Sequence, residues 1–162
     1  MEEFPLLEGK KILLVDDELD VLDTLEDLLS MCEVTKAINF KTAKDFLENQ
    51  EFDIAILDIM GVEGYTLLDT ASKQNVMAVM LTEHALSPEN VVRSYKGGAA
   101  SYLPKEKMVE ITSFLNDILE SKKQGENPWK RWYSRLSSYF EDKFGADWKD
   151  DQKEFWEKFP FY

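Results

Sequence analysis

Short apolar runs alternate along this chain with longer segments in which apolar residues recur at helical spacing. Each run has three to six residues, which is the length of a strand. The five runs are Lys11–Val15, Glu33–Ala37, Asp53–Leu57, Val76–Leu81 and Ser101–Leu103. Strands that alternate with helices form a parallel sheet, because each helix carries the chain back to the starting edge. The alternation predicts an α/β fold with a five-stranded parallel sheet wrapped by helices.

Five segments at helical spacing are expected to supply the helices around this sheet. Their approximate ranges are residues 21–29, 43–47, 65–72, 88–95 and 107–121. Pro88 suits a first helical turn, and Ser87 before it suits an N-terminal cap. The sheet and its helices therefore account for residues 1–121, which we predict to be one domain.

The composition changes after residue 121. Residues 122–128 (KKQGENP) are polar and contain Gly and Pro, which is typical of a linker. Twelve of the 20 aromatic residues, including all four Trp, lie in residues 129–162. An apolar stripe at helical spacing is formed by Trp129, Trp132, Tyr133, Leu136, Phe140 and Phe144. We predict a helical extension over residues 129–162, with a first helix ended by Gly145 and a shorter one over Asp147–Phe159.

The charge of the chain argues against a nucleic-acid partner. The formal net charge of the 162 residues is −13, whereas phosphate contacts need clustered Lys and Arg. Residues 129–162 hold seven basic and seven acidic residues, so the first 128 carry the excess, with 12 basic and 25 acidic. The extension is also too short for a winged helix, and no helix-turn-helix pattern is visible in it.

The expected location is the cytoplasm. No apolar run reaches the roughly 20 residues that a membrane-spanning helix needs, and the acidic N-terminus is unlike a secretory signal. Cys32 is the single cysteine and has no partner for a disulfide or a zinc site, which agrees with a reducing compartment.

Polar side chains lie at the ends of four predicted strands. Asp16 and Asp17 follow the first strand, Asp58 the third and Thr82 the fourth, and Lys105 lies just past the fifth. Ligands of parallel α/β sheets collect at the carboxyl ends of the strands. If the strand order is 2-1-3-4-5, three carboxylates meet in one small pocket. Carboxylates that close together repel one another, and Mg²⁺ with oxygen ligands would relieve the repulsion.

The same residues suit phosphoryl transfer. A carboxylate can attack phosphorus to give an acyl phosphate, while a metal ion, an ammonium and a hydroxyl share the charge on the equatorial oxygens. In this scheme Asp58 is the nucleophile, Lys105 the counter-charge and Thr82 the hydroxyl donor.

Four segments, KKILLVDDE, FDIAILDIM, VMLTEH and SYLPK, resemble in order and spacing the landmarks of bacterial two-component response-regulator receiver domains. The resemblance covers roughly residues 10–121. It implies a flavodoxin-like five-stranded parallel sheet of order 2-1-3-4-5 that takes a phosphoryl group from a histidine kinase or a phosphorelay protein. A receiver is not an enzyme acting on a separate substrate, because it promotes only its own Mg²⁺-dependent phosphorylation and dephosphorylation.

The resemblance also assigns a role to individual residues. It makes Asp58 the phosphoacceptor and places Asp16 and Asp17 on the metal. The Met60 backbone carbonyl becomes a further ligand of the metal. Thr82 becomes the switch hydroxyl and Lys105 the phosphate-contacting lysine. Tyr102 becomes the switch aromatic, which is expected to turn inward on phosphorylation and to change the face of the fourth helix, fifth strand and fifth helix.

The predicted pocket differs from the usual receiver pattern in three respects. The loop after Asp58 is about two residues shorter than usual and lacks a proline. Pro104 precedes Lys105, where the family commonly has a proline after its lysine, and Glu106 stands in that following position. Glu83 occupies a usually small position, and His84 lies where the family tunes dephosphorylation.

Several alternatives remain open from the sequence. The leading hypothesis is a phosphorylation-controlled response regulator that signals through protein contacts. The alternatives are a phosphorylation-incompetent pseudo-receiver that acts as an interaction module, and a fast-hydrolysing phosphate sink. The aromatic stripe is expected to pack on its own receiver, to pair two copies in a homodimer, or to dock an output protein. Membrane binding is disfavoured, because the polar face lacks a basic excess.

Overall fold

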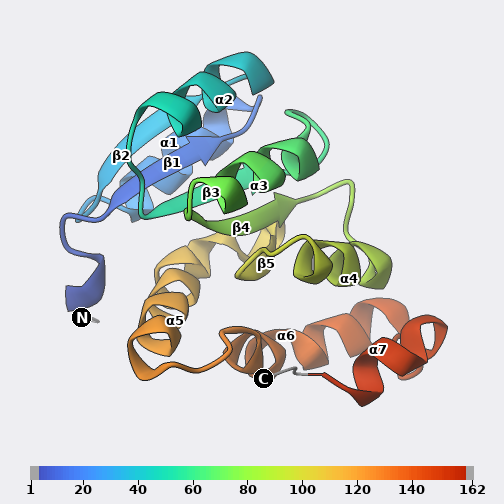
Figure 1. Ribbon diagram of the computed structural model, residues 1–162. Coiled ribbons are helices and arrows are strands. Elements are labelled where there is room, and N and C mark those ends of the chain that lie inside the picture. The colour runs from blue at the N-terminus through green and yellow to red at the C-terminus, as the bar shows by residue number, and fades with distance from the viewer. Residues whose placement is uncertain (1–3, 160–162) are drawn as a thin grey trace.

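A five-stranded parallel sheet of order β2-β1-β3-β4-β5 forms the centre of the protein, as a computed structural model that describes residues 4–159 shows (Figure 1). The strands are β1 (Lys11–Val15), β2 (Glu33–Ala37), β3 (Ile54–Asp58), β4 (Met77–Thr82) and β5 (Ser101–Pro104). The predicted flavodoxin-like class and strand order are confirmed. The central strands β1, β3 and β4 are almost wholly buried, which is why they are continuous apolar runs.

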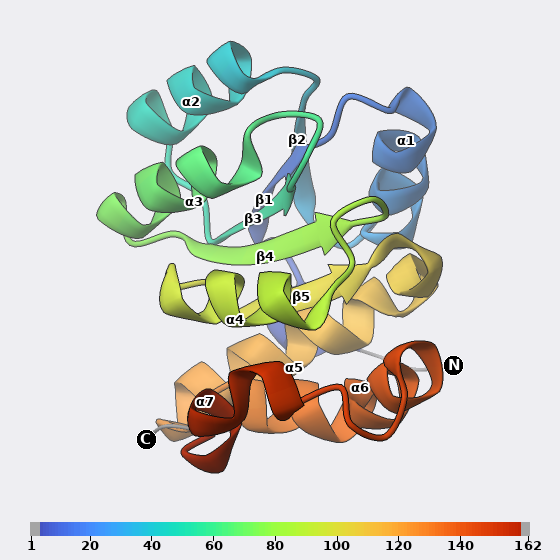
Figure 2. The same cartoon turned by 90° about the vertical axis from the view of Figure 1, so that its right-hand side faces the viewer.

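Among residues 4–159, five helices flank the sheet and two more follow it. They are α1 (Leu19–Leu28), α2 (Phe40–Asn49), α3 (Gly64–Lys73), α4 (Pro88–Lys96), α5 (Ile111–Gln124), α6 (Trp129–Phe144) and α7 (Lys153–Glu157). The described residues also form three 3₁₀ segments, η1 (Pro5–Leu7), η2 (Lys105–Glu110) and η3 (Asp150–Gln152). Helices α2, α3 and α4 lie on one side of the sheet and α1 and α5 on the other (Figure 2). The Ser87 hydroxyl caps α4 by accepting from the Asn90 N–H, as predicted.

Three strands end one residue later than the sequence indicates, β3 at Asp58, β4 at Thr82 and β5 at Pro104. The backbone of Asp58 pairs with Leu81, and the backbone of Thr82 pairs with Pro104. Both functional side chains therefore stand on the last residue of a strand and not on the loop after it. A strand fixes a side chain more firmly than a loop does, because its backbone is paired with a neighbouring strand.

The fifth helix differs from the predicted range 107–121. The 3₁₀ segment η2 occupies residues 105–110, and α5 then runs from Ile111 to Gln124, three residues into the predicted linker. Lys122 and Lys123 stabilise the carboxyl end of the helix dipole, and Gly125 ends the helix at φ 72°. The connection between α5 and α6 is therefore only residues 125–128. The outermost residues of the predicted domain and extension, 1–3 and 160–162, lie outside the described residues.

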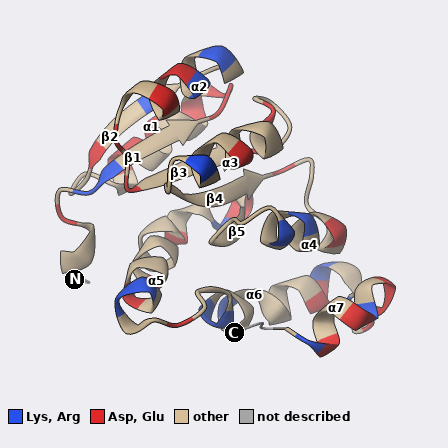
Figure 3. Ribbon diagram, viewed as in Figure 1, with Lys and Arg blue, Asp and Glu red and all other residues tan. Residues whose placement is uncertain are grey.

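The aromatic extension lies along the β5 edge of the sheet, beside α4, β5 and α5 (Figures 1 and 2). Helix α6 ends at Gly145 as predicted and buries the side chains of Trp129, Trp132, Leu136 and Phe140. The predicted second helix is shorter than Asp147–Phe159, because Gln152 leaves the helical region at φ −126° and ψ 40°. Basic and acidic residues are interspersed over α6 and α7, as Figure 3 shows. Within residues 4–159, no helix is both long and apolar enough to cross a membrane.

Candidate functional site

Three carboxylates meet at the carboxyl edge of the sheet. Asp16 and Asp17 follow β1, and Asp58 ends the neighbouring strand β3. Each offers an oxygen within 4.8 Å of the other two. Asp16 and Asp58 are buried, while Asp17 is exposed. The register of β1 against β3 aligns Val15 with Leu57, so the residues that follow them come to lie side by side.

Lys105 lies in the same pocket at the end of β5. Its Nζ is 2.9 Å from Asp16 Oδ2 and 3.5 Å from Asp58 Oδ1. It also lies 3.5 Å from Glu18 Oε2 at the exposed rim. One ammonium therefore faces several carboxylates, and the pocket has an excess of negative charge.

The pKa values of the pocket follow from this crowding. Burial raises the pKa of Asp58 above its usual value, and the charge of Asp17 raises it further, against the opposing effects of Lys105 and the Gly61 N–H. Burial likewise raises the pKa of Asp16. Burial alone would lower the pKa of Lys105, but its carboxylate neighbours, chiefly Asp16, raise it overall, so Lys105 stays charged at neutral pH.

Gly61 completes the pocket, and sequence reasoning missed it. Its N–H donates to Asp58 Oδ2 over 3.0 Å. A Cβ at this position would lie 2.5 Å from both Asp17 Oδ1 and Asp58 Oδ2, so any side chain would fill the gap between the two carboxylates. The available signal was a glycine three residues after the predicted phosphoacceptor in an unusually short loop.

The pocket suits a hard divalent cation. Several oxygen ligands converge on one point, and the space between Asp17 and Asp58 stays open because residue 61 has no side chain. A cation there would offset the repulsion that raises the pKa of Asp58. The acidic pocket of Asp16, Asp17 and Asp58 could thus bind a metal ion.

Thr82 and Tyr102 lie behind the pocket and are joined through one loop. The buried Thr82 Oγ1 accepts from the Ala85 N–H over 2.8 Å. The Tyr102 hydroxyl donates to the Ala85 carbonyl over 2.7 Å and accepts from the Ser87 N–H over 3.3 Å. The Tyr102 side chain is fully buried, so the ring already lies in the inward position that sequence analysis associated with phosphorylation.

The remaining residues of interest lie at the exposed rim. The Met60 side chain is 65% exposed in the turn after β3, and the assignment of its carbonyl as a metal ligand stays a prediction. Glu83 and His84 are exposed, and with Glu18 they form a second group of ligand atoms within 4.8 Å of one another. The rim therefore adds further negative charge around the entrance.

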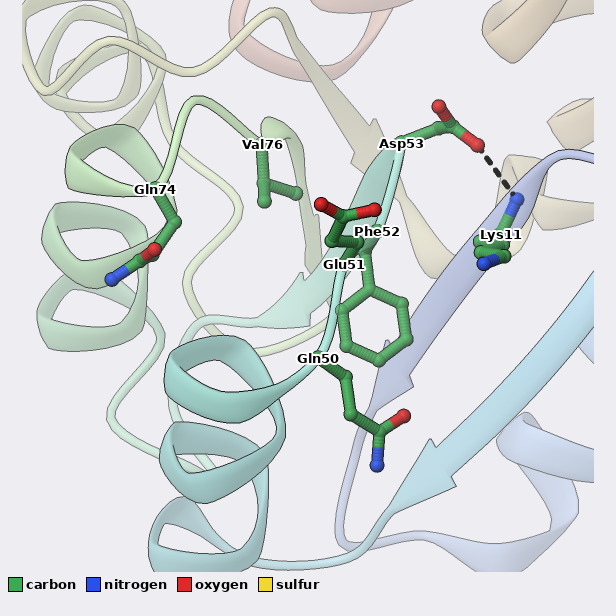
Figure 4. A pocket seen from close by; sticks show the side chains of 7 residues that line it. All are labelled: Lys11, Gln50, Glu51, Phe52, Asp53, Gln74 and Val76. Carbon is green, nitrogen blue, oxygen red and sulfur yellow. Dashed lines mark hydrogen bonds between the residues drawn. The ribbon is translucent and has the colours of Figure 1, made fainter.

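A hollow of about 460 Å³ lies at the opposite edge of the sheet, where β1, β3 and β4 begin (Figure 4). Asp53 accepts there from the Lys11 backbone N–H over 2.9 Å. The residues that line the hollow lie at the amino ends of the strands, whereas Asp58 lies at the carboxyl end of β3. It takes no part in the acidic pocket.

A sheet of this order with an acidic pocket and a lysine at its carboxyl edge is the arrangement of a phosphoacceptor signalling domain. The model of the response regulator receiver domain family matches residues 12–116, and the chain belongs to this family. Such a domain is typically not a catalytic enzyme, and it implies a phosphodonor kinase as partner. The pocket of Asp16, Asp17, Asp58 and Lys105 is consistent with phosphorylation of an aspartate.

Curated relatives include plant proteins. The chain is 32% identical over 135 residues to two-component response regulator ARR10 of Arabidopsis thaliana, covering 78% of this chain and 24% of the relative. It is 33% identical over 110 residues to two-component response regulator ARR18 of the same plant, covering 64% of this chain and 17% of that relative. The chain thus spans about a quarter or less of these relatives, and a specifically bacterial origin is not established.

Solved receiver structures have the same fold. A CheY-like receiver domain protein from Methanospirillum hungatei is 29% identical, with a TM-score of 0.60 over 71% of this chain and 99% of that chain. A receiver domain protein from Clostridium thermocellum is 27% identical, with a TM-score of 0.61 over 71% of this chain and 98% of that chain. Both leave more than a quarter of this chain unmatched.

Proposed function

We propose that this chain is a phosphorylation-controlled response regulator that accepts a phosphoryl group on Asp58 from a histidine kinase or a phosphorelay protein. The observation that carries the proposal is the pocket itself, in which Asp58 Oδ1 lies 3.5 Å from the Lys105 ammonium and its Oδ2 accepts from Gly61. These contacts hold the carboxylate in one orientation for attack.

The reaction forms one bond and breaks one. A carboxylate oxygen of Asp58 attacks phosphorus, the bond between phosphorus and the donor breaks, and an acyl phosphate remains. The Lys105 ammonium and the Thr82 hydroxyl would share the charge of the phosphoryl oxygens. Mg²⁺, held by Asp16, Asp17, Asp58 and the Met60 carbonyl, would supply the positive charge that the acidic pocket lacks.

The output of this regulator would be protein contacts in the cytoplasm. The net charge of −13 disfavours nucleic acid, and the balanced charge of residues 129–162 disfavours a membrane surface. A homodimer or a separate output protein remains the candidate partner besides the kinase.

One observation favours the alternative of a phosphorylation-incompetent pseudo-receiver. Glu18 and Glu83 crowd the entrance of the pocket and would repel an anionic phosphodonor. In that case the chain would act as a constitutive interaction module, with its acidic pocket as a remnant.

Incubation with acetyl phosphate and Mg²⁺, followed by intact-protein mass spectrometry, separates the two functions. We expect a gain of one phosphoryl group that is lost in Asp58→Asn. The matched control is Asp53→Asn, which changes an aspartate directly before the amino end of the same strand and should be phosphorylated normally. No mass gain in the unmodified protein would favour the pseudo-receiver, and rapid turnover of the donor would favour a phosphate sink.

A further inference from the structure

Helix α6 makes contact with the residue next to the pocket lysine. Glu106 directly follows Lys105 and is the second residue of the 3₁₀ segment η2. The Tyr139 hydroxyl donates to Glu106 Oε1, and Lys143 Nζ lies 3.1 Å from the same oxygen. Both partners come from the last two turns of α6. The extension therefore holds the chain one residue away from the group expected to contact the phosphoryl oxygens.

A second contact joins α6 to Tyr102, which is linked to Thr82 through Ala85. Trp132 Nε1 donates to the Tyr102 carbonyl over 2.7 Å, and the Phe140 ring packs 6.3 Å from the Tyr102 ring, between centroids. The Tyr102 hydroxyl in turn donates to the Ala85 carbonyl, and the Ala85 N–H donates to Thr82 Oγ1. A continuous set of contacts thus connects the Thr82 hydroxyl with the aromatic core of the extension.

Ion pairs with α5 and the burial of its aromatic side chains also fix α6 to the receiver. Arg131 pairs with Glu120, and Arg135 with Asp117, both on α5. The Trp132 and Phe140 side chains are 1% and 0% exposed, so they have little room to move without repacking. A displacement of Lys105 or Tyr102 must therefore be resisted by α6 or transmitted to it.

We propose that the extension is an intramolecular reader of the phosphorylation state of Asp58, and that Glu106 is the positioning residue that couples Lys105 to α6. The proposal rests on the proposed function. When Lys105 shifts its ammonium from Asp16 toward a phosphoryl oxygen, the start of η2 moves with it and pulls on Tyr139 and Lys143. The movement of α6 then changes the surface formed by α4, β5 and α5, against which the extension packs.

The contacts of Glu106 suit such a role because they are weak. Its side chain is 52% exposed, and exposed ion pairs contribute little to stability. The aromatic residues, not Glu106, hold α6 in place. A Glu106 variant should therefore fold normally and lose only the coupling, which allows a direct test.

The chain carries its own reporter for this test. All four Trp lie in the extension, at positions 129, 132, 148 and 156, so tryptophan emission reports on the extension and on its contacts with the receiver. We would record emission of the full chain in Mg²⁺ before and after adding beryllofluoride, a mimic of the phosphoryl group, and measure acetyl phosphate labelling separately by mass spectrometry.

The expected result is a change in emission of the unmodified chain that Glu106→Ala and Lys143→Met largely abolish and Lys143→Arg retains. The labelling rate of Glu106→Ala should differ about two- to fivefold from that of the unmodified chain, the range that an exposed pair can supply. The matched control is Glu120→Ala, which removes a half-buried glutamate that also pairs with α6 but lies on α5. It should keep both the emission change and the rate.

Two outcomes would overturn the inference while leaving the proposed function intact. One is normal labelling of Asp58 with no change in tryptophan emission. The other is an emission change in Glu106→Ala equal to that of the unmodified chain. A complete lack of labelling would instead remove the proposed function, and the inference with it.

Discussion

At the scale of single residues, the ionised carboxylates of the acidic pocket destabilise the folded protein. Asp16 and Asp58 are buried near each other and near Asp17, and Lys105 only partly offsets their charge. Burial and like charge both disfavour ionised carboxylates, which is why the pKa values of Asp16 and Asp58 are raised. Function and stability are therefore in opposition at this site.

Asp58→Asn should stabilise the protein in metal-free buffer. A raised pKa means that the protonated form is favoured in the folded state, so this stability is present below about pH 4 and is lost as pH rises through the raised pKa. At pH 7 the variant should have a higher free energy of unfolding than the unmodified protein, because it carries no charge there.

Urea denaturation at pH 7 and pH 4, with and without Mg²⁺, measures this gain. The gain should shrink at the lower pH and in excess Mg²⁺, since either a proton or a cation relieves the repulsion. A variant less stable than the unmodified protein at pH 7 without metal would contradict this account.

Gly61→Ala should damage the site without unfolding the protein. Its methyl group would lie 2.5 Å from oxygens of both Asp17 and Asp58, so the two carboxylates could no longer close on a cation. We expect Mg²⁺ affinity, measured by calorimetry, to fall at least about tenfold, the usual cost of disturbing groups around a metal. Gly9→Ala serves as control, since its Cβ would meet nothing within 4 Å. Unchanged affinity in Gly61→Ala would place the cation elsewhere.

At the scale of elements, strands and helices arise from patterns that neighbouring residues carry. The five runs, the Ser87 cap and the Gly145 helix end were all predictable, because each depends on a few adjacent side chains. The misplaced strand ends have a tertiary cause, because adjacent strands pair with Asp58 and Thr82. The predicted helix over residues 147–159 is instead interrupted locally, at the backbone angles of Gln152.

Gly125 sets where α5 ends and where the chain turns into the extension. It has φ 72°, and a Cβ there would meet no atom within 4 Å, so a side chain would cost only backbone strain. Gly125→Ala should therefore lower the free energy of unfolding by about 1 kcal/mol, whereas Gly125→Asn should cost less, since Asn tolerates this conformation. Thermal denaturation followed by circular dichroism would measure both, and equal losses would argue against the conformational explanation.

At the scale of the whole molecule, the division into a receiver and an extension stays a prediction, yet the two parts share one hydrophobic core. Trp129 Nε1 donates to the Ala99 carbonyl and Trp132 Nε1 to the Tyr102 carbonyl, both on or beside β5. Among the alternatives left open by the sequence, packing of the aromatic stripe on its own receiver is what the structure shows. A homodimer or output partner would have to use another surface or displace α6.

Trp132→Ala should test this shared core. The side chain is 1% exposed and touches the rings of Trp129, Phe140 and Trp156, so its loss should cost about 3–5 kcal/mol in the free energy of unfolding. We expect the unmodified chain to unfold in one transition whether followed by tryptophan emission or by circular dichroism. Two separate transitions, with Trp132→Ala altering only the first, would show that the extension unfolds alone.

The sequence by itself determined the α/β class, the strand order through its resemblance to receivers, and the residues that meet at the carboxyl edge. These follow from local periodicity and from the rule that parallel strands end at one edge. Only the tertiary structure decided how closely Gly61 approaches the carboxylates, that Tyr102 lies inward, and that α6 holds Glu106. Tyr139 and Glu106 are 33 residues apart, and Trp132 and Tyr102 are 30 apart. No pattern of neighbouring residues encodes such contacts, because they exist only after the chain has packed.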